Sequence, residues 1–160
     1  MATLPQLIEE DIEAMNRALD ELLARSEACA ALIIDKGGFL ITQTVHARQF
    51  DLVTLAALSA ASFAATQGIA NLVSETNFTS IYQQGEIHSL LVINIDEHCL
   101  LTVVFPAQVS VGAVKYFAAA TVKQVANQLQ KATQRNPTAR LDLSLINMAE
   151  TGPLFRKKTA

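Results

Sequence analysis

The chain has 160 residues, enough for one domain with a core of its own and too few for two. Hydrophobic residues make up 51% of the sequence and charged residues 17%, a composition that excludes an intrinsically disordered chain. Twelve basic and fifteen acidic residues give a net charge of -3, so the protein lacks the overall positive field that would draw nucleic acids or anionic membranes.

The first predicted element is an amphipathic helix over residues 4–26. Leucine, isoleucine and methionine recur there at helical spacing, while acidic residues fill the other face, a pattern more typical of a solvated face than of a binding site. The same acids, Glu9, Glu10, Asp11 and Glu13, stand where a signal peptide has a basic start and an apolar run. We therefore expect a cytoplasmic protein.

Two short apolar runs, Cys29–Ile34 and Phe39–Thr44, predict a β-hairpin, because the sequence Asp-Lys-Gly-Gly between them favours a tight turn. The glycine pair is not a phosphate-binding loop: neither GxxxxGK[ST] nor GxGxxG occurs, and no helix start follows.

Asp51 is a good N-cap for a second helix, which runs to about Val73 without a charged residue. Three further strands are predicted after it, and their apolar runs indicate that both faces of the sheet are covered. Val111 to about Thr133 predicts the last helix, with its apolar residues on one side. The sequence therefore predicts an α/β domain of the α+β type, with a sheet of about five mostly antiparallel strands and helices on both faces. The expected strands are 77–83, 87–95 and 100–105.

We expect the domain to span residues 1–134, with its core at 28–129, and residues 135–160 to form a C-terminal tail. The tail contains an alternating segment at 140–148, which predicts either an edge strand or a docking element. It ends in a basic tip at Arg156, Lys157 and Lys158, which is typical of a solvated terminus.

The uncharged stretch from Leu52 to Ser74 has the length of a membrane-spanning helix. Its alanines and its polar residues, among them Thr54, Gln67 and Asn71, make insertion into a bilayer unfavourable. Another buried environment must therefore explain why it carries no charge.

On a helical wheel this helix has two apolar stripes. One stripe holds large residues and should face the sheet: Leu55, Leu58, Ile69, Leu72 and Val73, with Leu52 and Phe63 at its edge. The opposite stripe holds small residues that would let another backbone approach closely: Ala57, Ala60, Ala61, Ala64 and Gly68. We expect the small-residue stripe to be the interface of a homodimer, in which it meets its own copy across a twofold axis. The alternative is an alanine-rich helix covered by the chain's own tail.

Residues for catalysis are sparse. None of the histidines, His46, His88 and His98, has a partner residue at a spacing typical of a catalytic site. No GxSxG, HExxH or CxxC motif occurs. Cys29 and Cys99 are expected to be reduced core residues. A triad assembled from distant residues stays open. We expect no catalytic residue, no cofactor and no metal, and the residues alone indicate a dimeric interaction domain.

The order of elements resembles the Roadblock/dynein light chain family, and its bacterial MglB-like members in particular. The similarity covers about residues 28–129 and leaves the tail unmatched. The segments that carry it are the first hairpin, the uncharged helix, the turn before the fourth strand, the fifth strand and the start of the last helix: Ala31–Leu40, Leu52–Ala57 with Ala64–Gln67, Gln84–Gly85, Leu100–Phe105 and Gly112–Lys115.

The resemblance implies a homodimer that binds a small Ras-like GTPase of the MglA type and regulates it without being an enzyme. Such partners can stimulate GTP hydrolysis by repositioning groups on the GTPase, without an arginine finger of their own. Two alternatives stay open. One is an adaptor that links cargo or a larger assembly. The other is a small-ligand sensor or enzyme, which a deep apolar pocket with two or three convergent polar groups would favour.

Overall fold

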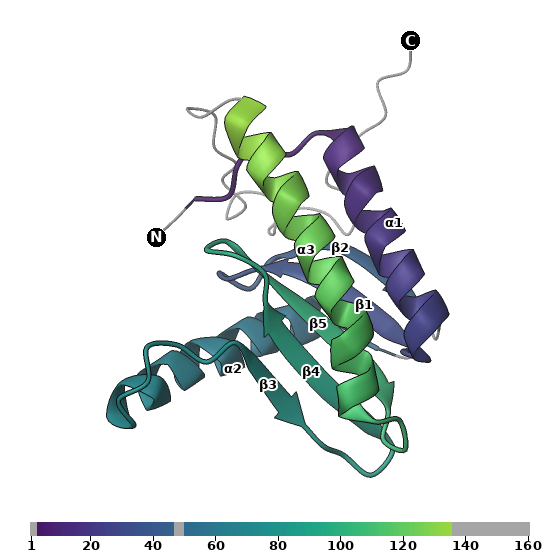
Figure 1. Cartoon of the computed structure of the whole chain (residues 1–160), viewed down its shortest axis with the longest axis vertical. Coiled ribbons are helices and arrows are strands. Elements are labelled where there is room, and N and C mark those ends of the chain that lie inside the picture. Colours follow the sequence, from purple (N-terminus) through teal and green to yellow (C-terminus); the bar gives the residue numbers. More distant parts are fainter. Residues whose placement is uncertain (1–2, 47–49, 136–160) are drawn as a thin grey trace.

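The computed structural model describes residues 3–46 and 50–135. It contains three helices and five strands, arranged in one antiparallel sheet with the strand order β2-β1-β5-β4-β3 (Figure 1). In chain order the elements are α1 (Glu9–Ser26), β1 (Ala30–Asp35), β2 (Leu40–Val45), α2 (Leu52–Leu72), β3 (Ser80–Gln83), β4 (His88–Asn94), β5 (Cys99–Pro106) and α3 (Val111–Arg135).

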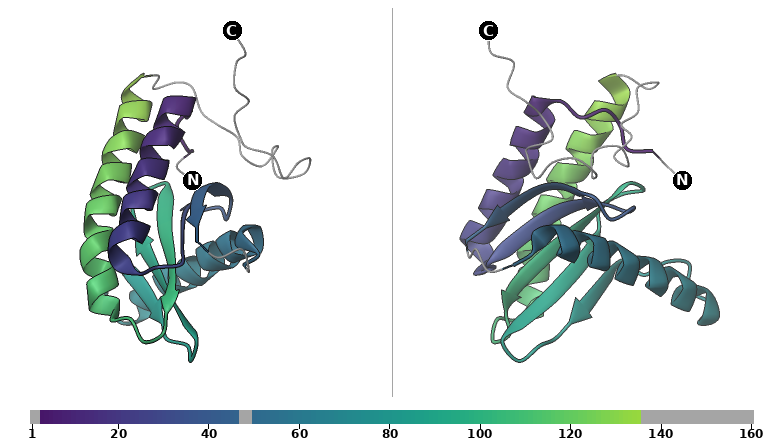
Figure 2. Two further views of the ribbon diagram at one scale, coloured as in Figure 1. Left: turned by 90° about the vertical axis from the view of Figure 1, so that its right-hand side faces the viewer. Right: turned by 180° about the vertical axis from the view of Figure 1, so that it is seen from behind.

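The sheet has helices on both faces, which confirms the predicted fold class. Helices α1 and α3 lie side by side on one face, and α2 lies alone on the other (Figure 2). The central strand β5 pairs with both β1 and β4, so the two hairpins join into one sheet. Its residues from Cys99 to Phe105 are all buried, as expected for a strand covered on both sides.

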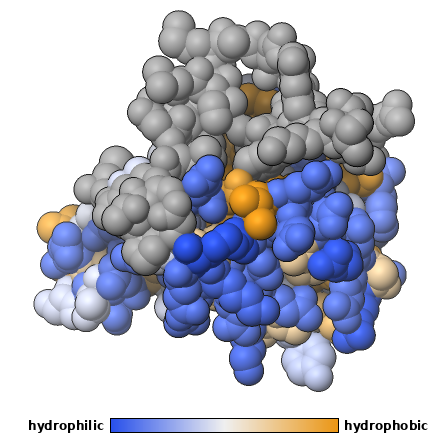
Figure 3. Space-filling model, turned by 90° about the horizontal axis from the view of Figure 1, so that it is seen from above, coloured by the Kyte–Doolittle hydropathy of each residue, from blue (hydrophilic) through white to orange (hydrophobic). Residues whose placement is uncertain are grey.

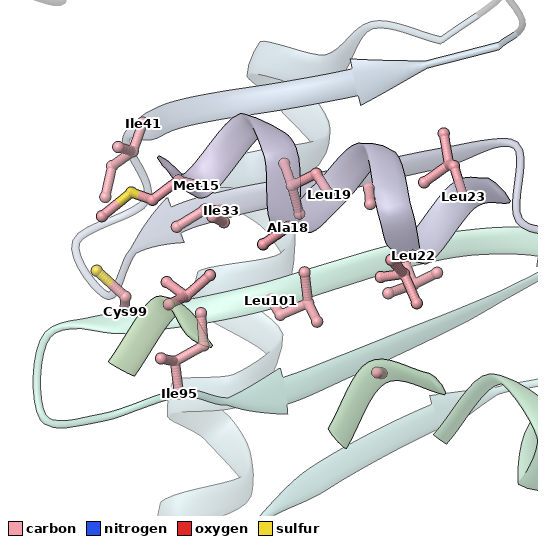
Figure 4. Close-up of a cluster of buried hydrophobic side chains, with 14 of the residues drawn as sticks. Met15, Ala18, Leu19, Leu22, Leu23, Ile33, Ile41, Ile95, Cys99 and Leu101 are labelled. Atoms are coloured by element: carbon pink, nitrogen blue, oxygen red, sulfur yellow. The ribbon is translucent and has the colours of Figure 1, made fainter. Parts of the chain in front are cut away.

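Alternation along the strands sends side chains to two separate cores. Ile33, Leu101 and Val103 pack under α1 and α3, where they meet Met15, Leu19 and Leu22 of α1 (Figure 4). Their neighbours along the strands, Leu32, Leu100 and Val104, point to the other face of the sheet and pack against α2. Helix α2 thus covers a core of its own.

Helix α1 begins at Glu9, five residues later than predicted. Leu4 and Leu7 are buried in the same core as the apolar side of α1, which explains why they look like part of the helical pattern. They reach this core from a non-helical segment that contains Pro5. The third strand is also shorter than predicted, since β3 starts at Ser80. Predictions for the tail beyond Arg135 lie outside the described residues, and the domain boundary stays a prediction.

A buried carboxylate joins the start of α1 to the end of α3. Asp11 is fully buried and accepts hydrogen bonds from the Ile8 backbone N–H at 2.8 Å and from Gln128 Nε2 at 2.7 Å. Two further bonds come from the Arg135 guanidinium, at 2.9 and 3.0 Å. Burial raises the pKa of this carboxyl, but the hydrogen bonds outweigh burial, so the net shift is below its ordinary value of 3.8.

We expect Asp11→Ala to lower the free energy of unfolding by about 2–3 kcal/mol, because the Ile8 N–H and the Arg135 guanidinium lose their buried acceptor. The pKa of Asp11 is lowered in the folded state, so its stabilisation is present above the unfolded pKa and is lost as pH falls through the folded value. Urea unfolding at pH 7 and pH 3 measures this effect: the difference in the free energy of unfolding between the wild type and the variant should be smaller at pH 3 than at pH 7.

The exposed neighbour Glu13, changed to Gln, serves as control. Equal stability of wild type and Asp11→Ala at pH 7 would contradict the role of this carboxylate.

Candidate interaction surface on helix α2

Helix α2 starts where the sequence predicts. The Asp51 carboxylate accepts a hydrogen bond from the Thr54 backbone N–H at 3.1 Å and another from the Thr54 hydroxyl, which caps the first turn. The helix then crosses the sheet and extends past the edge strand β3, so that its C-terminal end projects from the body of the domain (Figure 2). Its buried positions are few: Ala56, Ser59, Ala60, Phe63 and Ala70.

The predicted orientation of α2 is wrong. Of the large residues expected to face the sheet, Leu55 packs against the α2-side core, whereas Leu58 is 63% exposed and Leu72 is 85% exposed. Ile69 and Val73 are also exposed. At 100° per residue the helix is turned by about a third of a turn from the predicted position, so that a boundary between the two stripes faces the sheet. Small side chains at the contact let the helix lie close, and Phe63 fills the remaining space.

The five residues predicted as a dimer interface lie in different environments. Ala60 is buried against the chain's own sheet, while Ala57, Ala61, Ala64 and Gly68 are not buried. The backbone of Ala57 lies close to the β1–β2 turn, because a Cβ built on Gly38 would be 3.2 Å from the Ala57 Cα. The interface role of this stripe stays a prediction.

The outer face of α2 is apolar and uncharged. No Asp, Glu, Lys or Arg occurs from Leu52 to Leu72, and the exposed large side chains on and just after the helix are Val53, Leu58, Ile69, Leu72 and Val73. By length and composition α2 could cross a membrane, yet it packs on its own sheet through Ala56, Ala60 and Phe63. Large apolar side chains exposed on an uncharged helix are typical of a site where another surface binds.

An open sheet edge lies beside the projecting end of α2. Among the described residues, β3 pairs with β4 alone, so its other edge carries backbone N–H and C=O groups without a strand partner. Tyr82 on this strand is 37% exposed. The apolar helix face and the strand edge together form the candidate interaction surface.

The end of the molecule where α1 begins and α3 ends is more hydrophilic than the outer face of α2. Seen from above, its described surface is mostly hydrophilic, with a small hydrophobic patch beside the residues drawn in grey (Figure 3).

The histidines and cysteines occupy separate places. His46 and His88 are exposed, and the ring of His88 meets Phe50 edge-on at 5.3 Å. His98 is nine-tenths buried, with Nε2 3.3 Å from Glu97 Oε1. Burial raises the pKa of both thiols, Cys29 and Cys99, and Cys99 is shifted well above its ordinary value. In the described part of the chain, no group of three or more His, Cys, Asp or Glu side chains could hold a metal ion.

The chain was compared with known families and structures. Residues 15–105 match the Roadblock/LC7 domain. A structure described as MglB with tetrameric arrangement is 31% identical, covers 82% of this chain and 99% of its own, and has a TM-score of 0.77. The gliding protein MglB from Thermus thermophilus is 30% identical over the same shares, with a TM-score of 0.75. Myxococcus xanthus MglB is 25% identical over 79% of this chain and 96% of its own, with a TM-score of 0.73.

The search of curated proteins returned no significant match.

The close approach of the β1–β2 turn to α2 makes Gly38 essential to the position of the helix. Its φ of +100° and the 3.2 Å approach to the Ala57 backbone both disfavour a side chain there. Gly38→Ala should lower the free energy of unfolding by about 2 kcal/mol. Gly112→Ala is the matched control, because its Cβ would meet only the Ser110 hydroxyl at 3.5 Å. Thermal unfolding compares the two, and equal midpoints would show that the turn does not constrain α2.

Proposed function

Since the chain belongs to the Roadblock/LC7 domain family, as the sequence resemblance predicted, we propose that it is a non-enzymatic regulator that acts as a homodimer and binds a small Ras-like GTPase of the MglA type. The observation that carries the proposal is the exposed, uncharged face of α2, on a domain 31% identical to an MglB structure. We propose that it acts in the cytoplasm.

Self-association through α2 would bury apolar side chains that are exposed in the single chain. Burying a leucine or isoleucine side chain completely contributes about 1.5–3 kcal/mol, and Leu58, Ile69 and Leu72 are each more than half exposed. A second copy offers the same face, so a twofold contact would cover both copies at once. The absence of charge over the whole helix means that such a contact leaves no unpaired ion. The tetrameric arrangement named for one similar MglB structure supports self-association.

The edge of β3 provides a second element for the same contact. Because α2 projects beyond this edge, a partner lying under the helix end would also reach the unpaired backbone groups of Ser80–Gln83 (Figure 1). Strand pairing across the edge would satisfy these groups and hold the two sheets in register.

The GTPase is proposed from the similarity to MglB proteins. A regulator of this kind needs no catalytic group of its own, because it acts by binding one arrangement of the GTPase more tightly than another. A difference of about 1.4 kcal/mol in binding the hydrolysis-competent arrangement shifts its population tenfold. This requirement is modest for a protein interface.

Two substitutions test the dimer. Leu72→Glu and Ala61→Glu each place a carboxylate on an exposed part of α2, the first among the large residues and the second among the small ones. In a dimer through this face the carboxylate would be buried without a partner, at a cost of about 3 kcal/mol, which weakens association roughly a hundredfold. Light scattering measures the mass in solution.

The control for the dimer is Tyr116→Glu on α3, since Tyr116 is 77% exposed and lies on the opposite side of the sheet. The wild type and this control should have twice the mass of the chain, and the two α2 variants should move to the monomer. A monomeric wild type, or α2 variants that both stay dimeric, would contradict an interface on α2.

The regulatory activity is tested with an MglA-type GTPase in single-turnover hydrolysis. We expect the wild-type protein to raise the rate about tenfold or more. Leu72→Glu should lose this effect if the dimer is the active form. A complex that forms without any change in rate indicates an adaptor, and no complex at micromolar concentration would overturn the proposed partner.

A further inference from the structure

A cavity of about 870 Å³ lies at one end of the sheet, on the side covered by α2. Its walls come from α2, from the β1–β2 and β4–β5 turns and from the loop before β3. Leu100 and its cross-strand partner Asn94 lie at the sheet side. The volume is within the range of pockets that bind small molecules. The cavity shares Ala60 and Ala64 with the predicted small-residue stripe, whereas Leu58 and Leu72 on the outer face of α2 do not line it.

The apolar part of the lining suits a group with the size of an aromatic ring. Phe39 follows the β1–β2 turn, Phe63 extends from α2 and Phe78 comes from the loop before β3. Leu100 adds an aliphatic surface. Aromatic walls of this kind favour a flat apolar body in edge-on or stacked contact.

Three of the polar residues that line the cavity carry an atom without a hydrogen bond. Among the described residues, Gln67 Oε1, Asn94 Oδ1 and His98 Nδ1 have no partner, and each atom is buried, so it does not face the cavity in this side-chain conformation. Leaving such atoms unpaired costs about 1–3 kcal/mol each. Gln67 and Asn94 end in rotatable amides, so a small turn of either side chain could offer its oxygen to a donor in the cavity.

Acidic groups outnumber basic ones among the residues that line the cavity. Asp35 belongs to the β1–β2 turn, Asp96 and Glu97 to the β4–β5 turn, and Lys36 and His98 are the basic side chains. The two turns are joined by a hydrogen bond from the Lys36 N–H to the His98 carbonyl at 2.9 Å.

The two aspartates are held in place by backbone bonds. The Asp35 carboxylate accepts from the Gly37 N–H, and the Asp96 carboxylate accepts from the N–H groups of His98 and Cys99. Burial raises the pKa of Asp35, so its charged form lacks full compensation. A cation next to these groups would supply that compensation.

We propose that this cavity binds a small organic cation, with an aromatic or similarly sized apolar body against Phe39, Phe63 and Phe78 and an ammonium head against Asp35, Asp96 and Asn94. Binding at this site would place a small molecule next to the proposed interaction surface. Gln67 lines the cavity from the same turn of α2 that carries Ile69 on the outer face, so an occupied cavity would hold that turn in place. The site does not depend on the proposed GTPase and is tested without it.

The test is a titration of the full-length, isotope-labelled protein, followed by amide chemical shifts. The probe is 2-phenylethylammonium, compared with neutral 2-phenylethanol and anionic phenylacetate. We expect saturable shifts at Gly37, Gln67 and Asn94, with the cation binding at least tenfold more tightly than the anion and the alcohol in between. No saturable shift at millimolar concentration would overturn the proposal. Equal affinities for the three probes, or shifts confined to another part of the fold, would also overturn it.

A charge-neutral variant separates the ammonium contact from the apolar one. In the double variant Asp35→Asn and Asp96→Asn, the amide oxygens can still accept the turn N–H bonds, so the turns should be kept. The preference for 2-phenylethylammonium over 2-phenylethanol should disappear, while the alcohol binds as before. Glu9→Gln with Glu13→Gln makes the same charge change on the exposed side of α1 and should leave the preference intact. An unchanged preference in the Asp35 and Asp96 variant would refute the ammonium subsite.

Discussion

The structure depends on one helix that must be covered on two sides. The inner side of α2 lies on Leu32, Leu100 and Val104, where it closes the second core of the domain. Its outer side exposes Leu58 and Leu72 to solvent and has no charged residue to keep it soluble. Solvent-facing helices normally carry charge on that side. The missing charge therefore points to a partner, and the same property supports self-association and the interaction role.

The two faces of the sheet are covered in different ways. On the α1 and α3 face, the core is closed by two helices whose ends are joined through Asp11 and Arg135. On the α2 face, a single helix covers the sheet, extends beyond β3 and forms one wall of a cavity. The surfaces that we propose for a second copy and for a small molecule thus both lie at α2.

Much of the fold could be predicted from the sequence because its signals are local. The Asp51 cap, the glycine turn after β1 and the largely apolar run of β5 each act within a few residues. The rotation of α2 about its axis could not be predicted, because charged residues normally mark the solvent-facing side of a helix and α2 has none. The Asp11–Arg135 contact and the cavity were also beyond prediction, since they join residues far apart in the chain, such as Phe39, Phe63 and Phe78.

The most direct measurement of the central claim is an isotope-filtered nuclear Overhauser experiment on a mixture of methyl-labelled and unlabelled chains. It detects contacts between two copies and ignores contacts within one. The account predicts intermolecular signals at the methyl groups of Leu58, Ile69 and Leu72, which are exposed within the single chain. Intermolecular signals from α3 alone, or none at concentrations where the protein is folded, would contradict it.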